Sequence, residues 1–291
     1  MSKNYILLPP KISHNMILRR SNIYIVEGEV QVLKAASLRA EDGAKIYLVN
    51  GMFRKSRLKR SALIFNQGSS FKFINLTISA ADKSYKTIKL ADNGGVWFLG
   101  TKNAASKDSI KIAKKMKIPF SSFTGKKLSL RYLGKEDGQS SINEDIDGIS
   151  ILGVDKHEWN ISSVSSNYSG DDGLDLTNSH ISLNSLDIKN PAEDAINLSS
   201  SRLEIHKSLK ICSPKNGIKD RDLFDFESDD GASYLELYRG TSVNIEGVFG
   251  DQLNIYSQDM PIPITKGENE RTYKFNKKLK NSALIFTIDK D

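Results

Sequence analysis

The sequence predicts an all-β fold in which the chain coils into about nine stacked turns. A five-residue pattern, Asp-x-apolar-polar-apolar, recurs through the second half of the chain every 22 to 29 residues. Its two apolar positions lie two residues apart, the spacing of a strand with one buried face. A unit this short cannot bury its apolar face alone, so successive units must stack. The pattern begins at Asp147, Asp172, Asp194, Asp222 and Asp251.

Three short strands complete each predicted turn. In the shortest turn, three apolar pairs separated by polar turn residues fill the interval before the next Asp. These pairs are Leu174/Leu176, Ile181/Leu183 and Leu186/Ile188. The apolar half of the pattern also occurs outside the Asp-led units, which extends the coil in both directions. Those further pairs are Ile46/Leu48, Leu63/Phe65, Val96/Phe98 and Leu284/Phe286.

We expect the coil over residues 41–291, with residues 1–40 as an N-terminal cap and residues 99–145 as an insertion. Residues 101–140 contain ten Lys or Arg and three acidic residues, which accounts for the whole net charge of +7. Within this segment, the stretch SKDSIKIAKKMKI at 106–118 places apolar residues on one helical face among lysines. It predicts a short basic helix, although its isoleucines would also suit a strand.

The three-strand repeat, the stacked aliphatic columns and the Asn- and Ser-rich turns resemble the right-handed parallel β-helix proteins of the pectate-lyase-like superfamily. The phrase GDDGLDL at 170–176 is similar to repeats of β-helix domains associated with spore-coat CotH-type kinases. The resemblance implies a right-handed coil; the superfamily includes polysaccharide lyases, hydrolases and non-catalytic scaffolds. Asp147 and the Asp171-Asp172 pair match the galacturonan-hydrolase acids loosely, and that family's Gly-His-Gly is missing.

Composition restricts the location and the cofactors. The single cysteine, Cys212, excludes an internal disulfide and a multi-cysteine zinc site. Pro9 and Pro10 interrupt the start of the chain where a signal peptide would need a continuous apolar stretch. No window approaches the roughly 20 apolar residues of a membrane span. We therefore expect a cytoplasmic protein as numbered, or an extracellular one if a signal peptide was removed, with no membrane partner.

The Asp that opens each unit has three possible roles. It can accept hydrogen bonds from backbone N–H groups one or two residues further on, as in an Asx turn. It can bind a hard cation such as Ca²⁺, for which Asp171, Asp172 and Asp194 are the candidate ligands. Acid–base chemistry is the third possibility, for which the candidate catalytic residues are Asp172 and, from the polar position inside the unit, Asp175 and Asp225. Asp175 and Asp225 are expected two turns, or about 9.6 Å, apart, near the upper limit for inverting glycoside hydrolysis.

The polar position inside each unit points away from the core and forms a second column. That outward column is Ser150, Asp175, Asn197, Asp225 and Asn254. Trp97 occupies the same position on an earlier turn, where it can stack on a sugar or be covered by the insertion. We expect Trp97, Asn197 and Asn254 to contact substrate, and Lys114 and Lys115 of the insertion to hold an acidic polymer by charge.

Two classes of function agree with these features. The first is a β-helix that binds or processes an acidic polysaccharide, as a lyase or a hydrolase, with Ca²⁺ as the candidate cofactor. The second is a non-catalytic scaffold or recognition module that docks a protein partner through the basic insertion. The insertion lacks the interleaved aromatic residues of a single-strand platform, which argues against nucleic acid. The oligomeric state is not predicted.

Overall fold

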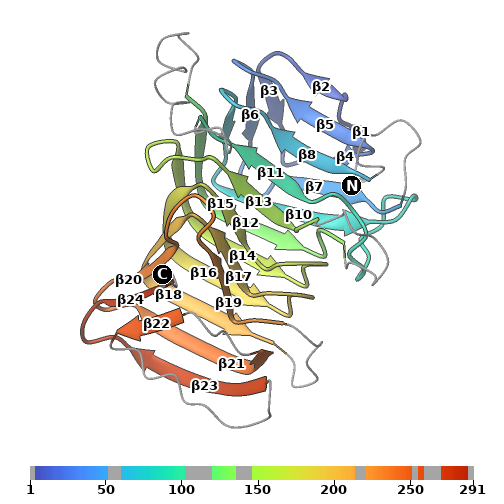
Figure 1. Cartoon of the computed structure of the whole chain (residues 1–291). Helices are drawn as coiled ribbons and strands as arrows, with labels where there is room; N and C mark the ends of the chain where they lie inside the picture. The colour runs from blue at the N-terminus through green and yellow to red at the C-terminus, as the bar shows by residue number, and fades with distance from the viewer. Residues whose placement is uncertain are drawn as a thin grey trace.

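The computed structural model describes residues 4–51, 60–101, 120–135, 146–213, 221–250, 255–258 and 270–287. Within these ranges every regular element is a strand, and the strands form two sheets (Figure 1). The smaller, eight-stranded sheet contains, in spatial order, β19 (Phe224–Glu227), β17 (Ile196–Ser199), β15 (Asp175–Thr177), β13 (Ile149–Leu152), β11 (Val96–Leu99), β8 (Ala62–Phe65), β5 (Glu29–Val32) and β2 (Lys11–Ile12).

The larger sheet has sixteen strands. Its main path is β1 (Asn4–Leu7), β4 (Asn22–Val26), β7 (Lys45–Val49), β10 (Asn75–Ala81), β12 (Ser122–Arg131), β14 (Trp159–Asn167), β16 (His180–Lys189), β18 (Arg202–Cys212), β20 (Tyr234–Leu237), β24 (Ala283–Thr287) and β22 (Ile255–Gln258). The remaining strands are β3 (Met16–Leu18), β6 (Ser37–Ala40), β9 (Ser70–Lys72), β21 (Ser242–Gly250) and β23 (Glu270–Lys278).

The chain alternates between the two sheets and advances by one strand each time. From β13 to β20, each strand of one sheet is followed in the chain by a strand of the other sheet. Each strand pairs in parallel with the previous strand of its own sheet. Asp175 pairs with Asn197 in one sheet, and Ile181 pairs with Leu203 in the other. Both pairs are separated by 22 residues in the chain. The predicted all-β, parallel and repetitive organisation is confirmed for this region.

The second and third predicted strands of a turn join into one long strand. The pairs Ile181/Leu183 and Leu186/Ile188 both belong to β16. The pairing of β16 with β18 shifts register between Leu183 and Ser185, where β18 contains one more residue. The corner expected between two strands is therefore an irregularity inside one strand.

Residues of both sheets form one main hydrophobic core, and its composition changes along the chain. Toward the N-terminus it contains aromatic rings: Phe65 and Phe98 stack at 5.1 Å with their planes 8° apart, and Trp159 meets Phe98 edge to face. In the later strands it is mainly aliphatic, with Leu176 and Leu198 in register and fully buried. Each such side chain contributes about 1.5–3 kcal/mol on burial.

Of the early apolar pairs, Leu63/Phe65 lies beside Val96/Phe98 as expected, and Ile46/Leu48 does not. Leu63 and Phe65 pair with Val30 and Val32 of β5, whereas Ile46 and Leu48 belong to β7 in the larger sheet. Parallel pairing also begins upstream of residue 41, because β2 pairs with β5 and β4 with β7. Residues 4–40, expected as a cap, therefore carry the same parallel pairing as the coil.

The predicted last turn is wrong, because parallel pairing ends with β20 and β21, which both pair with β18. β24 pairs antiparallel with both β20 and β22, and β23 pairs antiparallel with β21. The buried residues of β24 are Ala283 and Ile285, while Leu284 and Phe286 are only partly buried. Two-residue alternation is common to parallel and antiparallel strands and does not say which set faces inward.

The predicted insertion is partly a regular strand. Residues 122–131 form β12, which pairs in parallel with β10, β14 and the short strand β9. The basic helix expected at 106–118 lies outside the described residues. Across the described part of the chain, no helix of the length and apolarity of a membrane span occurs.

Candidate functional site

The outward column predicted from the sequence is aligned by the register of the eight-stranded sheet. Trp97 pairs with Ser150, and Ser150 with Asp175. Asn197 follows Asp175, and Asp225 follows Asn197. Adjacent parallel strands lie about 4.8 Å apart, so these five side chains form a row across five strands. Asn254, the sixth predicted member, lies outside the described residues.

Along the first four members of this row, from Trp97 to Asn197, lies a shallow trough, which we call the outward trough, with a cavity volume of about 280 Å³. Its lining residues are Trp97, Asp147, Ser150, Leu152, Asp175, Thr177, Asn197, Ser199 and Glu227. Asp175 is recessed, with 8% of its surface exposed, and Trp97 is half-buried. The trough therefore places an indole beside carboxylates, hydroxyls and an amide. Trp97 and Asn197, both expected to contact substrate, line this trough, whereas Glu227 was not singled out from the sequence.

Some shielded polar atoms of trough residues have no hydrogen-bond partner among the described residues, and we consider the two that belong to the outward row. They are the indole N–H of Trp97 and the side-chain oxygen of Asn197, both shielded from solvent. The Asn197 side chain also hydrogen-bonds the Asp172 carboxyl group behind it. Shielded polar groups normally have a partner, so these two atoms are places where water or a ligand can bind.

Behind the trough, the opening aspartates join one turn to the next. Asp172 Oδ1 accepts a hydrogen bond from the backbone N–H of Asp194 at 2.9 Å. Asp194 Oδ1 accepts one from the backbone N–H of Asp222 at 2.5 Å. We call these three residues the aspartate ladder. The sequence predicted acceptance from amides one or two residues on; the observed donors belong to the following turn, because the next parallel strand is only about 4.8 Å away.

Burial raises the pKa values of two carboxyl groups in the ladder. Asp172 and Asp194 are 4% and 7% exposed. Burial raises the pKa of Asp172 well above its usual range, although the amide of Asp194 and the side chain of Asn197 oppose the shift. Burial, followed by the charge of Asp172, raises the pKa of Asp194 to about 9. With this pKa the Asp194 carboxyl group holds its proton at neutral pH, which weakens its repulsion with Asp172.

The predicted cation ligands are only partly brought together. Asp171 and Asp172 lie with Glu193 in a group whose carboxylate oxygens are within 4.8 Å of one another. Asp194 instead accepts the amide of Asp222. Glu193 could have been found by aligning SGDDG with PAEDA, since it occupies the position of Asp171. Asp171 accepts the amide of Ile146 at 3.0 Å and Asp172 accepts the amide of Asp194 at 2.9 Å, so one oxygen of each carboxyl group is already engaged by the backbone.

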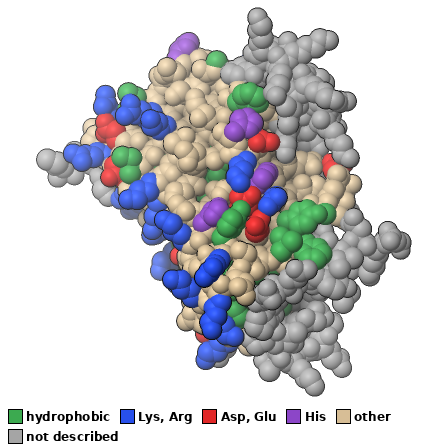
Figure 2. All heavy atoms as spheres, turned by 90° about the vertical axis from the view of Figure 1, so that its left-hand side faces the viewer, with side chains coloured by type: hydrophobic (Ala, Val, Ile, Leu, Met, Phe, Trp, Pro, Cys, Tyr) green, Lys and Arg blue, Asp and Glu red, His purple; other side chains and the backbone are tan. Residues whose placement is uncertain are grey.

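A different buried carboxylate lies on the larger sheet. Glu204 of β18 is 2% exposed in its side chain and is surrounded by positively charged groups and histidines. Its oxygens contact Lys156 Nζ at 2.7 Å, His180 Nε2 at 2.9 Å and Arg202 Nε at 3.4 Å, with His206 Nε2 at 3.9 Å. We call these five residues the Glu204 cluster. Histidine and charged side chains of both signs gather near the centre of the face in Figure 2.

The Glu204 carboxyl group has a lowered pKa. Burial acts to raise it, but the hydrogen bonds from Lys156 and His180 and their charges outweigh burial. His206 also accepts or donates a hydrogen bond with Ser182 Oγ at 2.7 Å and stacks on Tyr238 at 4.1 Å. No sequence pattern pointed to this cluster, because its members come from β16, β18 and the turn before β14.

The remaining predicted site residues, Lys114 and Lys115, lie outside the described residues. The assignments of Asp172, Asp175 and Asp225 to catalysis remain predictions. In comparisons with known proteins, no protein-family model matches the chain, and neither a curated protein nor a solved structure matches it significantly.

Proposed function

We propose that this protein is a right-handed parallel β-helix of the pectate-lyase-like type that binds a polysaccharide in the outward trough. The fold part of the proposal is supported by parallel pairing that repeats every 22 residues in both sheets between β15 and β18. The function part is supported chiefly by one observation: the in-register row Trp97, Ser150, Asp175, Asn197 and Asp225.

The chemistry of the trough suits a sugar chain. An aromatic ring can cover the apolar face of a sugar, while carboxylates and amides accept and donate hydrogen bonds to hydroxyl groups. Asp147, Asp175 and Glu227 all line the trough, so an uncharged polymer can bind directly. An acidic polymer needs a bridging cation such as Ca²⁺, or the lysines of the predicted basic segment, to offset repulsion from these carboxylates.

Hydrolysis is the catalytic extension of this proposal. Asp175 and Asp225 are separated by the strand that carries Asn197, which corresponds to about 9.6 Å between backbones. Inverting glycosidases hold their two carboxyl groups about 6.5–9.5 Å apart so that a water molecule fits between them and the sugar. The general acid in such a pair must hold a proton near neutral pH.

The test is binding to a panel of neutral and acidic polysaccharides, each with Ca²⁺ and with a chelator, measured by calorimetry. We expect one polymer to bind, and Trp97→Ala and Asp175→Asn each to weaken that binding about tenfold. The matched control is Tyr234→Ala, an aromatic residue 36% exposed on the other sheet, which should leave binding unchanged. Chain length by size exclusion, and unsaturated ends by ultraviolet absorbance, distinguish binding, hydrolysis and lyase chemistry.

A non-catalytic scaffold is the second candidate, and the aspartate ladder favours it. Asp172 and Asp194 each accept a hydrogen bond from a backbone amide of the next turn, and such hydrogen bonds stabilise the fold. No binding across the whole panel would support the scaffold and contradict carbohydrate recognition.

A further inference from the structure

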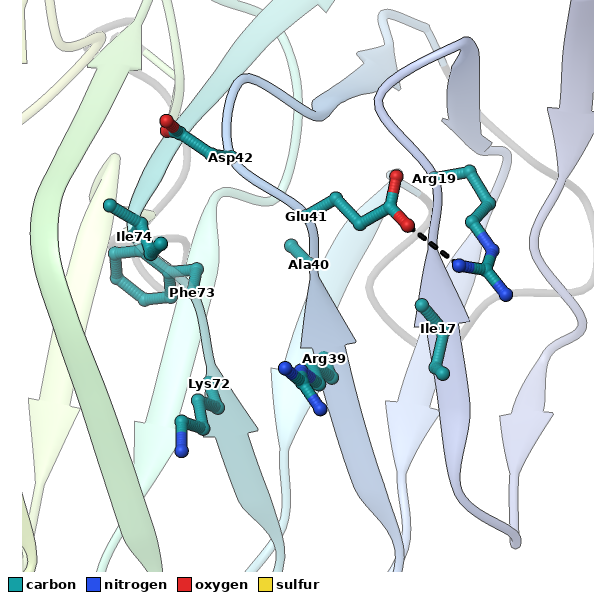
Figure 3. Close-up of a pocket in the computed structure, with 9 residues that line it drawn as sticks. All are labelled: Ile17, Arg19, Arg39, Ala40, Glu41, Asp42, Lys72, Phe73 and Ile74. Carbon is teal, nitrogen blue, oxygen red and sulfur yellow. Dashed lines mark hydrogen bonds and ion pairs between the residues drawn. The ribbon is translucent and has the colours of Figure 1, made fainter.

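A second pocket lies on the outer face of the larger sheet, far from the outward trough in the strand order. Its cavity volume is about 390 Å³, within the roughly 300–1,000 Å³ of small-molecule sites. Figure 3 shows its lining, which comes from β3, β6, β9 and the turns that follow them. The charged lining residues are Arg19, Arg39, Glu41, Asp42 and Lys72, and the apolar ones are Ile17, Ala40, Phe73 and Ile74.

Two positive charges face each other across adjacent strands in this pocket. Arg39 of β6 and Lys72 of β9 are register partners in a parallel pair, so their backbones lie about 4.8 Å apart. Like charges directly opposite each other on neighbouring strands are destabilising. No ion pair of either side chain occurs among the described residues, and both are exposed. An anion bound between them would remove this repulsion.

The acidic residues of the same pocket accept hydrogen bonds from groups other than Arg39 and Lys72. Glu41 accepts from Arg19 Nη1 at 2.7 Å, drawn in Figure 3, and from the backbone N–H of Arg20 at 3.0 Å. Asp42 accepts from Asn75 Nδ2 at 2.8 Å. These two carboxylates still add negative charge at the pocket's edge, which disfavours a ligand with several negative charges. The positive charges of Arg39 and Lys72, set against these two carboxylates, favour a ligand with a single negative charge.

The rest of the pocket is apolar and unusually exposed. Ile17 and Ile74 are 46% and 52% exposed and lie on either side of the two cations. Beside them the buried ring of Phe73 lies directly against the backbone of Gly125, where an added Cβ would sit 2.2 Å from the ring. A ligand with an apolar body would cover the isoleucines and remove that surface from water.

We propose that this pocket binds a small monoanion with an apolar body, such as an aliphatic or aromatic carboxylate or sulfonate. The anionic group lies between Arg39 and Lys72, and the apolar body lies on Ile17 and Ile74. This site is independent of the outward trough and of polysaccharide binding. It selects against sugar acids, whose hydroxyl groups would lose hydrogen bonds to water over the isoleucines.

The test uses the full chain and 8-anilinonaphthalene-1-sulfonate, an aromatic sulfonate whose fluorescence increases on binding. We expect saturable binding that Arg39→Gln with Lys72→Gln weakens at least tenfold and Ile74→Asn weakens about fivefold. The matched control is Lys210→Gln, an exposed lysine on β18 of the same sheet, which should not change the affinity. Circular dichroism should show that the variants, all at exposed positions, keep the fold.

Displacement then identifies the chemistry of the ligand. Hexanoate and benzoate should displace the dye, while galacturonate and inorganic sulfate at the same concentration should not. Unchanged affinity in the Arg39→Gln, Lys72→Gln double variant would overturn the proposal. Equal displacement by galacturonate or sulfate would overturn the requirement for an apolar body.

Discussion

Two buried carboxyl sites of this molecule have opposite electrostatics. In the aspartate ladder, Asp172 and Asp194 are buried against backbone amides and each other, and their pKa values are raised. In the Glu204 cluster, a carboxylate with equally little exposure contacts Lys156 and His180, and its pKa is lowered. Solvent exposure is small at both sites, but the two aspartates lie deep in the molecule, whereas Glu204 lies on the outer face of the larger sheet beneath its cationic partners. Depth of burial and the partners together therefore decide the charge.

The largest expected effect is a difference in pH dependence. An Asp titrates near 3.9 when unfolded, whereas Asp194 has a pKa of about 9 in the folded chain. Between these values the folded state binds the extra proton, so the free energy of unfolding falls as pH rises, by up to about 1.4 kcal/mol per pH unit. Asp194→Asn keeps an oxygen for the Asp222 amide and removes the titration. Its advantage over the parent chain should grow from pH 5 to pH 9, measured by urea unfolding.

The control for this comparison is Asp187→Asn, at a half-buried position on β16. It should leave the slope of stability against pH unchanged. Equal slopes for Asp194→Asn and the parent chain would show that Asp194 is ionised in the fold and would break the comparison.

The next largest effect comes from removing the ionised carboxylate. Glu204→Ala leaves Lys156 and two histidines without this counter-charge, and leaves Arg202 with Glu236 as its partner. Breaking a fully buried ion pair costs about 3–5 kcal/mol; because Lys156 and Arg202 are half-exposed, we expect about 2–3 kcal/mol at pH 7. Glu236→Ala removes a partly exposed partner of Arg202 and should cost under about 1 kcal/mol. Similar losses for the two variants in urea unfolding would show that burial of Glu204 adds nothing.

The smallest expected effect is the loss of stability when an uncharged hydrogen bond between turns is removed. At another turn, Ser201 Oγ donates to Leu176 O at 3.0 Å and accepts from Ser179 N at 2.9 Å, so it joins neighbouring turns as the aspartates do. Ser201→Ala should cost about 1–2 kcal/mol at every pH from 5 to 9, because no titratable group is involved. A loss that varies with pH would mean that the serine turn is coupled to the ladder.

Sequence reasoning predicted the repeated strands and the row from Ser150 to Asp225, because alternation and equal spacing follow directly from parallel stacking. It failed for Leu284 and Phe286, where the same alternation occurs in an antiparallel strand with the opposite face buried. It also could not predict the Glu204 cluster, since that cluster depends on which side chains from different turns meet on the outer face. The protonation of Asp194 required its burial, which no local pattern contains.

The most direct test of the opposite charge states is a titration of side-chain carboxyl carbons by nuclear magnetic resonance, with assignments from Asp172→Asn, Asp194→Asn and Glu204→Gln. The structure predicts that Asp194 titrates near pH 9 and that Asp172 titrates well above the usual range of an aspartate. It predicts that the Glu204 signal remains that of an ionised carboxylate down to below its usual pKa. Titration of all three groups near pH 4 would contradict the account.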